Sequence, residues 1–225
     1  MNSIKARAAT SKPRVPDPPA EIGSIKLDEL TWSPDQPLVR VYRLEHSPTA
    51  FNPGKGRGRF HPIQSSRGKP IPTLYAAQNL AGAAMETLFR ATASDSVPRF
   101  VPRALVEQYG YATLKVRRAL LLLPLWGNNL RRLGLTRGRL LEPGPTHYER
   151  TARWAAALHQ GFAKVDGLAW YSRQFDGSVC VMLFGDRFKQ RDLKPIMSPI
   201  SFADDSGFEV IVRIATQADI TIVER

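Results

Sequence analysis

The stretch Val179-Cys180-Val181-Met182-Leu183-Phe184 is apolar throughout and has the length of one strand. Successive side chains of a strand point to opposite faces of a sheet, so a strand without polar residues needs cover on both faces. Shortly before it, Gly167-Leu168-Ala169-Trp170-Tyr171 is typical of a second strand. Together the two runs predict a buried sheet at the centre of the fold.

Further strands are expected on both sides of this pair. In residues 39–44, Val39, Val41 and Arg43 face one way and the intervening side chains face the other. The remaining strand candidates are residues 72–76, 111–116 and 119–123, and the tail over residues 208–223 alternates well enough for one or two more.

Two helices are expected among these strands. Residues 78–90 carry an apolar stripe at helical spacing. Thr146 opens the second helix, because Thr146-x-x-Glu149 has the spacing of a capping box. Residues 126–141 are irregular or form a short basic helix. The pattern lacks the regular alternation of strand and helix found in doubly wound sheets, which favours an α+β fold.

The chain divides into three parts. Residues 1–37 are a proline-rich, partly disordered N-terminal arm, in which residues 25–30 can dock as a partial helix. Residues 38–187 hold the main domain, including a long loop over residues 45–71 that is rich in glycine and arginine. Loops of this length are usually functional or mobile. Residues 188–225 are a C-terminal extension that we expect to add strands to the same domain.

The composition narrows the class of protein. The net charge of +12 over 225 residues favours a negatively charged ligand or partner, namely nucleic acid, an anionic membrane surface, a phosphate-bearing small molecule or an acidic protein.

Cys180 is the single cysteine, so we expect no intrachain disulfide and a reducing cytoplasm. No apolar run approaches the roughly 20 residues that span a bilayer. Cys180 and the four histidines lack metal-ligand spacing, so no metal site is expected.

Four short segments carry side chains suited to a ligand. Gly56-Arg57-Gly58-Arg59-Phe60 combines a closely approachable backbone with guanidinium forks for phosphate. Tyr75, at the end of a strand, can stack on a planar ring. Glu86 lies beside the apolar stripe of the first helix, and Ser172 follows a strand without the Gly-x-Ser-x-Gly elbow of serine hydrolases. Singly, each has a plainer interpretation: a solvated loop, a half-buried aromatic, a surface glutamate and a capping serine.

Taken in order, the segments are more informative. The series Tyr42-Arg43, Gly58-Arg59-Phe60, Leu74-Tyr75-Ala76-Ala77, Ala84-Met85-Glu86 and Tyr171-Ser172-Arg173, followed by the run at 179–184, resembles the RES domain family, which supplies the toxins of RES–Xre toxin–antitoxin modules. The resemblance covers roughly residues 38–187. It departs from the family in a longer stretch between Arg59 and Tyr75, and in Phe60, where tryptophan is common. The spacing leaves Arg57 as a rival to Arg59.

The resemblance implies a fold similar to that of ADP-ribosyltransferase toxins: a split, mostly antiparallel sheet with flanking helices around an NAD cleft. It implies that NAD is a substrate and not a prosthetic group, broken at the nicotinamide–ribose bond with water or phosphate as acceptor. The family's arginine, tyrosine, glutamate and serine fall on Arg59, Tyr75, Glu86 and Ser172, and Arg43 matches a further arginine of the pocket. An Xre-like helix-turn-helix antitoxin is the implied partner, and nucleic acid is contacted only through it.

The chemistry of the bond suggests a role for each residue. Its cleavage builds positive charge on the ribose, which the carboxylate of Glu86 would stabilise. Arg59 and Arg43 would hold the pyrophosphate, Tyr75 would pack against the nicotinamide or its ribose, and Ser172 would bind the ligand or position Glu86. Two alternatives stay open. One is an ADP-ribosyltransferase that modifies a macromolecule, and the other is a basic nucleic-acid-binding protein that uses the arginine-rich loop and the cluster at residues 131–139.

Overall fold

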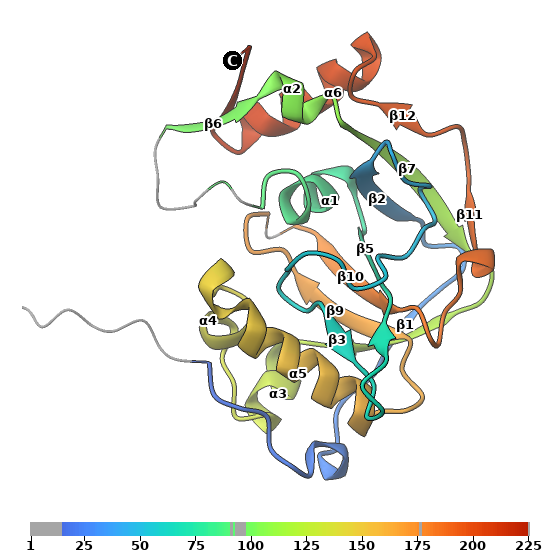
Figure 1. Ribbon diagram of the computed structural model, residues 1–225, viewed down its shortest axis with the longest axis vertical. Helices are drawn as coiled ribbons and strands as arrows, with labels where there is room; N and C mark the ends of the chain where they lie inside the picture. The colour runs from blue at the N-terminus through green and yellow to red at the C-terminus, as the bar shows by residue number, and fades with distance from the viewer. Residues whose placement is uncertain (1–14, 91, 93–97, 176, 225) are drawn as a thin grey trace, which may run out of the picture.

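A computed structural model describes residues 15–90, 92, 98–175 and 177–224 (Figure 1). Its centre is a nine-stranded sheet in the order β1-β8-β9-β10-β5-β2-β7-β11, with β12 also paired to β7. Strands β8 and β9 run parallel, whereas the other neighbours run antiparallel. The strands are β1 (Leu30–Trp32), β2 (Leu38–Arg43), β5 (Thr73–Ala77), β7 (Tyr109–Val116), β8 (Leu120–Pro124), β9 (Gly167–Tyr171), β10 (Val179–Phe184), β11 (Leu193–Pro195) and β12 (Ile200–Ser201).

The sheet divides between β2 and β5. These two strands share the single register pair Val39–Ala77, whereas β2 pairs with β7 from Leu38 to Arg43 and β5 pairs with β10 along its whole length. Past that one pair the two halves diverge. The predicted α+β fold with a mostly antiparallel sheet is therefore confirmed.

Helices and two small sheets surround this sheet (Figure 1). The hairpin of β3 (Ile63–Gln64) and β4 (Pro70–Ile71) lies within the long loop, and β6 (Arg99–Pro102) pairs in parallel with β13 (Ile220–Val223). The helices are α1 (Leu80–Glu86), α2 (Arg103–Val106), α3 (Gly127–Arg132), α4 (Arg137–Leu140), α5 (Tyr148–Gly161) and α6 (Asp205–Gln217), with 3-10 turns η1 (Ile22–Ser24), η2 (Pro145–His147) and η3 (Gln190–Asp192).

Strand β10 separates two hydrophobic cores. Cys180, Met182 and Phe184 join the core that packs against α1 and α5, whereas Val181 and Leu183 join a second core on the opposite face. The second core also draws side chains from both ends of the strand order, β1 and β11, so the sheet curls around it. The expectation that residues 179–184 are buried on both faces is confirmed.

The described part of the N-terminal arm is packed against the domain. Val15 is fully buried, and the backbone oxygen of Pro16 accepts a 2.7 Å hydrogen bond from Trp154 Nε1 on α5. Residues 25–30 do not form the expected partial helix. They run extended from η1 into β1, because the backbone of Leu30–Trp32 pairs with β8. Residues 1–14, the first part of the predicted arm, lie outside the described residues.

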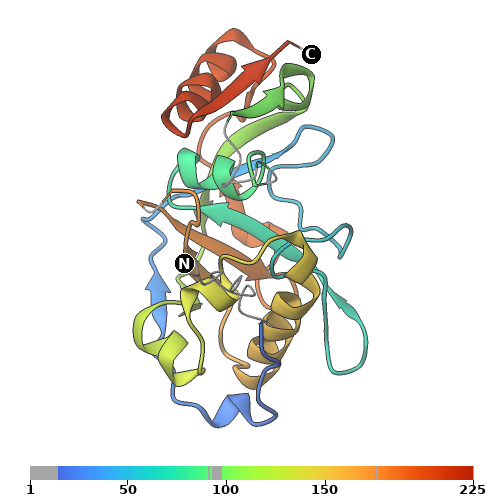
Figure 2. The ribbon, with the colours of Figure 1, turned by 90° about the vertical axis from the view of Figure 1, so that its left-hand side faces the viewer.

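The C-terminal segment corrects another expectation. Residues 205–217 form the helix α6 and not a strand, although β13 follows at Ile220–Val223. Gly207, Ile211 and Ala215 recur every four residues and are the buried face of this helix. With β6, α2 and β13, α6 makes a layer at the top of the molecule (Figure 2). Strands β11 and β12 extend the central sheet at β7.

Two details of the helices also differ from expectation. The helix predicted at 78–90 ends at Glu86, after which Thr87 leaves helical geometry. The predicted capping box at α5 is wrong. The chain enters α5 through η2, so Thr146 lies in a turn, where its Oγ1 is 3.0 Å from His147 Nδ1, and Glu149 pairs with Arg153. Residues 126–141, expected to be irregular or to form one short basic helix, hold the two short helices α3 and α4.

Candidate functional site

Helix α1 presents Glu86 at its C-terminal end. Asn79 caps the helix, its Oδ1 accepting a 2.9 Å hydrogen bond from the backbone N–H of Gly82. Gly82 lets the helix approach the start of β10 closely, because a Cβ at this position would lie 2.1 Å from Ser178 Oγ. The carboxylate of Glu86 is thus fixed relative to the loop between β9 and β10.

That loop binds one oxygen of the Glu86 carboxylate. Ser172 Oγ donates to Glu86 Oε1 at 3.0 Å, and the backbone N–H of Arg173 donates to the same oxygen at 3.1 Å. Two donors on Oε1 leave the second oxygen, Oε2, facing Arg59 Nη2 at 3.8 Å. Ser172 is fully buried, and the side chains of Arg59 and Glu86 are only 8% and 10% exposed. The pair is therefore largely shielded from solvent, where charge interactions are strong.

Arg59 is held by its backbone. Thr151 Oγ1, a fully buried hydroxyl on α5, donates to the Arg59 carbonyl oxygen. The backbone N–H of Gly58 donates to the His61 carbonyl at 3.0 Å, which closes the turn around Arg59. Within the described residues, Nε and Nη1 of Arg59 have no hydrogen-bond partner. The guanidinium therefore has two donors that are both buried and unpaired, which is uncommon in folded proteins.

Tyr75, on β5, is joined to the turn that carries Arg59. Its hydroxyl accepts a 3.1 Å hydrogen bond from the Phe60 backbone N–H and lies 3.2 Å from His61 Nδ1. Burial raises the pKa of Tyr75 above its ordinary value, and burial with the nearby Arg90 charge lowers the pKa of His61 to about 4. At neutral pH His61 is thus uncharged, and a hydrogen bond joins its Nδ1 to the Tyr75 hydroxyl.

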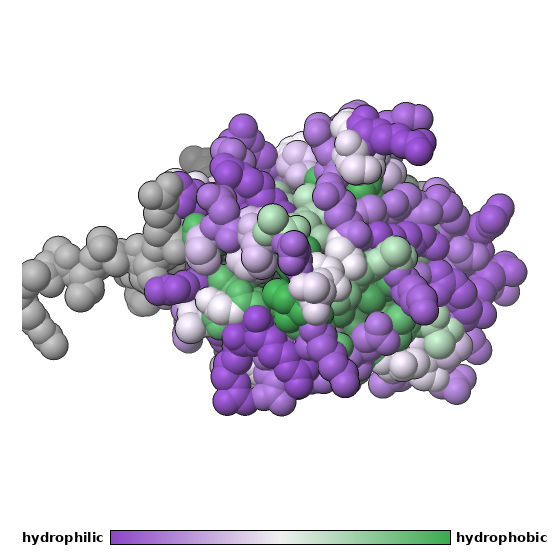
Figure 3. Space-filling model, turned by 90° about the horizontal axis from the view of Figure 1, so that it is seen from below, coloured by the Kyte–Doolittle hydropathy of each residue, from purple (hydrophilic) through white to green (hydrophobic). Residues whose placement is uncertain are grey.

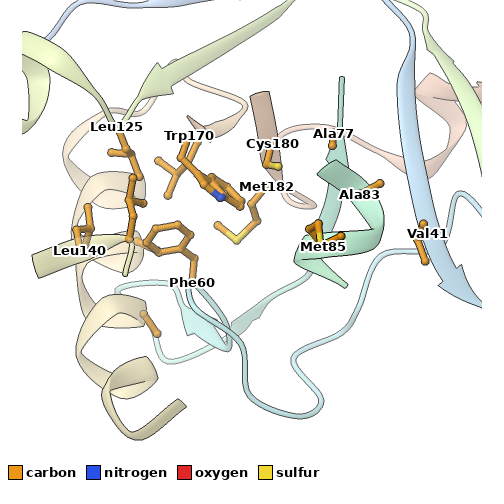
Figure 4. Close-up of a cluster of buried hydrophobic side chains, with 14 of the residues drawn as sticks. Val41, Phe60, Ala77, Ala83, Met85, Leu125, Leu140, Trp170, Cys180 and Met182 are labelled. Atoms are coloured by element: carbon orange, nitrogen blue, oxygen red, sulfur yellow. The ribbon is translucent and has the colours of Figure 1, made fainter. Parts of the chain in front are cut away.

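Aromatic rings pack against Tyr75 and the turn that carries Arg59. The Trp170 ring lies edge-on to Phe60 at 5.2 Å and to Tyr75 at 5.9 Å. Figure 4 shows Trp170 and Phe60 side by side, between the face of α1 that carries Met85 and the helices on the other side. The turn at 58–61, strand β5 and strand β9 are therefore packed as one rigid unit around the polar residues.

The structure brings together four of the five predicted site residues, Arg59, Tyr75, Glu86 and Ser172, from separate segments of the chain. Arg43 is not among their contacts. It lies exposed at the end of β2, where it donates to Gln108 Oε1 at 2.9 Å and sits 5.2 Å above the Tyr109 ring.

Arg59, and not its rival Arg57, faces Glu86. Arg57 is exposed, and its carbonyl accepts from Arg90 Nη2.

Sequence reasoning missed several supporting residues. Arg173 binds Glu86 through its backbone, which leaves no signal in residue type. The Gln174 side-chain amide donates to the carbonyls of Met85 and Phe89, and its backbone N–H donates to Ser172 Oγ at 3.3 Å, so it ties the end of α1 to the serine. His61 carried no motif that would have linked it to Tyr75.

The described residues also bear on metal binding and on membrane spanning. Within the described ranges, no group of three or more histidine, cysteine, aspartate or glutamate residues is arranged to hold a metal ion. The helices in this part of the chain are also too short or too polar to cross a bilayer.

Comparison with known families gives the site its context. The family model of the RES domain matches residues 37–205, which is three quarters of the chain. The chain therefore belongs to the RES domain family. The RES domain is found in the toxins of toxin–antitoxin systems and indicates an enzyme related to ADP-ribosyltransferases. A search of curated proteins finds no match.

Proposed function

We propose that this protein degrades NAD by breaking the bond between nicotinamide and ribose, as the toxin of a toxin–antitoxin module. The observation that carries the proposal is the convergence of Glu86, Ser172, Arg59 and Tyr75 in one shielded place. Membership in the RES domain family supports the proposal as well.

The carboxylate of Glu86 is suited to the charge that this reaction develops. The C1′–N bond breaks with its electron pair passing to nicotinamide, so that positive charge grows on the ribose. Ser172 and Arg173 hold Oε1, and Oε2 is left to face the sugar. A carboxylate oriented before the reaction stabilises the transition state more than the ground state. Water or phosphate then adds to C1′, with release of a proton when water is the acceptor.

The other residues bind the substrate. Arg59 offers the unpaired Nε and Nη1 to the pyrophosphate, as charge-assisted hydrogen bonds. Tyr75 packs against the nicotinamide or its ribose, with its hydroxyl fixed by Phe60 and His61. Arg43 stays a predicted contact of the pyrophosphate, reached from the exposed end of β2.

The decisive experiment compares the wild-type protein with Glu86→Gln. Each is incubated with NAD, with and without inorganic phosphate, and the products are separated by chromatography. We expect nicotinamide with ADP-ribose or its phosphate ester from the wild type, and a rate at least about 100-fold lower from Glu86→Gln. Glu209→Gln is the matched control, because Glu209 is exposed on α6. A wild-type rate in Glu86→Gln would refute the role of this carboxylate.

The same assay separates the alternatives. Labelled ADP-ribose attached to a protein or nucleic acid would identify an ADP-ribosyltransferase. Unchanged NAD together with nucleic-acid binding that falls steeply with salt would identify a nucleic-acid-binding protein.

We also propose that an Xre-like helix-turn-helix antitoxin binds this protein and silences it. A surface with net charge +12 is suited to an acidic segment of such a partner. Co-expression with the product of a neighbouring reading frame should restore growth to cells that express the toxin, and the two proteins should co-purify. We further expect the protein to act in the cytoplasm.

A further inference from the structure

A cavity of about 730 Å³ lies between the β3–β4 hairpin and α5. Pockets that bind small molecules usually measure about 300–1,000 Å³, so the space suits a nucleotide-sized ligand. Figure 3 views the end of the molecule where the hairpin and α5 lie, and it shows hydrophobic surface bordered by hydrophilic residues. Glu86 does not line this cavity, which is therefore separate from the carboxylate site.

The floor of the cavity is apolar and its rim is polar. Ile63, Ala152 and Tyr148 are buried residues of the floor, whereas the amides of Gln64 and Gln160 stand at the rim. An apolar floor with a few amides that offer both a donor and an acceptor suits a planar, hydrogen-bonding ring. This combination is the chemistry of a purine site.

The charge of the cavity favours a phosphate. Glu149 is the carboxylate in the lining, and Arg153 pairs with it at 3.0 Å and with Asp17 at 3.0 Å. In the described part of the chain the Arg57 guanidinium has no hydrogen-bond or ion-pair partner. Arg57 therefore leaves an uncompensated positive charge at the edge of the cavity.

The cavity adjoins the carboxylate site through two elements. His61 lines the cavity and also contacts the Tyr75 hydroxyl, so this residue links the cavity to the carboxylate site. On α5, Thr151 holds the Arg59 carbonyl, and the next residue, Ala152, lines the cavity. A ligand longer than one nucleotide would pass over the segment at 57–61, which carries Arg57 and Arg59.

We propose that this cavity binds the adenylate half of the dinucleotide, with the purine on the floor and its phosphate at Arg57. The assignment rests on the proposed function, because it places the nicotinamide half beside Glu86 and Tyr75. It adds a binding site, formed by the hairpin and α5, that contributes affinity and takes no part in bond cleavage.

The test is calorimetric titration of the full chain carrying Glu86→Gln, with AMP and separately with nicotinamide mononucleotide. In that background, Ala156→Trp fills the cavity from α5, and Ala163→Trp places the same ring at an exposed site outside it. Arg57→Ala removes the unpaired charge, and Arg67→Ala removes an equal charge from the exposed hairpin. Circular dichroism checks that each variant is folded.

We expect Arg57→Ala to weaken AMP binding about tenfold or more, as the loss of one charge-assisted contact would. Ala156→Trp should weaken it at least as much, because the indole ring occupies the space proposed for the purine. Ala163→Trp and Arg67→Ala should change it less than about twofold, and Ala156→Trp should leave nicotinamide mononucleotide binding unchanged. Absence of AMP binding, or equal losses in the variants and their controls, would overturn the assignment. If the wild type still cleaves NAD in that case, only the cavity proposal falls.

Discussion

Replacing Ser172 by alanine tests whether the serine orients the carboxylate. The change removes one of the two donors to Glu86 Oε1 and leaves the Arg173 N–H at 3.1 Å. A hydrogen bond to a charged group contributes about 1.5–3 kcal/mol. Because the second donor stays in place, we take the lower part of that range, about 1.5–2 kcal/mol. NAD cleavage should therefore slow roughly ten- to thirtyfold.

The kinetic assay separates orientation from binding. An interaction that acts mainly in the transition state lowers kcat and leaves KM nearly unchanged. Ser178→Ala is the control, because Ser178 Oγ is also buried near α1 but has no hydrogen-bond partner in the described part of the chain. We expect Ser178→Ala to keep the wild-type rate. Equal rates for Ser172→Ala and Ser178→Ala would refute the reasoning.

Three further predictions concern stability, and thermal unfolding measures each. Gly82→Ala should lose about 1–3 kcal/mol by crowding Ser178, and Ser178→Gly in the same chain should restore most of it; no restoration would contradict this packing. The pKa of His61 is about 4 in the folded protein and 6.5 in the unfolded chain, because folding buries the neutral imidazole. The free energy of unfolding should therefore be highest above pH 6.5 and should fall by about 3 kcal/mol as the pH falls toward 4. This acid sensitivity should be reduced in His61→Gln, and an identical pH profile would count against it. Asp166→Ala should lose about 2–3 kcal/mol, because the buried carboxylate binds the Arg118 guanidinium and the Leu121 N–H; a loss under about 0.5 kcal/mol would show that water replaces these contacts.

The central strands could be predicted because a strand that is buried on both faces carries apolar residues at successive positions. Residues 167–171 and 179–184 were expected as strands and match β9 and β10. The helix α6 was not predictable in the same way. Its β-branched residues Val210, Ile211, Val212 and Ile214 favour strands, and alternation with polar neighbours hid the four-residue spacing of the buried face. Packing against the domain decided this segment, and propensity did not.

The candidate site was predictable only as an ordered set. Arg59, Tyr75, Glu86 and Ser172 each have an ordinary local context, and the order of their motifs along the chain indicated that they belong together. The contacts of Arg173 and Thr151 could not be predicted from the sequence. Arg173 binds Glu86 through its backbone N–H, and Thr151 binds the backbone carbonyl of Arg59. Backbone hydrogen bonds between distant segments depend on the fold and not on the residue type.

The pairing of Arg59 with Glu86 is a poor arrangement for stability. The two charges are 8% and 10% exposed, yet their closest contact is 3.8 Å, and two guanidinium donors have no partner among the described residues. A buried pair offsets its desolvation only with close geometry and satisfied hydrogen bonds. Such a cost is characteristic of sites kept for ligand binding, where stability is given up for function.

A comparison of single and double variants tests whether the buried Arg59–Glu86 pair costs stability. Glu86→Gln keeps an amide oxygen for Ser172 and Arg173 but leaves the Arg59 charge buried without its counter-charge, so the free energy of unfolding should fall by a few kcal/mol, about the cost of one uncompensated buried ion. Adding Arg59→Met removes that charge and should recover most of the loss. Denaturant unfolding followed by circular dichroism measures both changes. If the double variant is instead less stable than Glu86→Gln alone, Arg59 holds the fold together and its unpaired donors are no sign of a substrate.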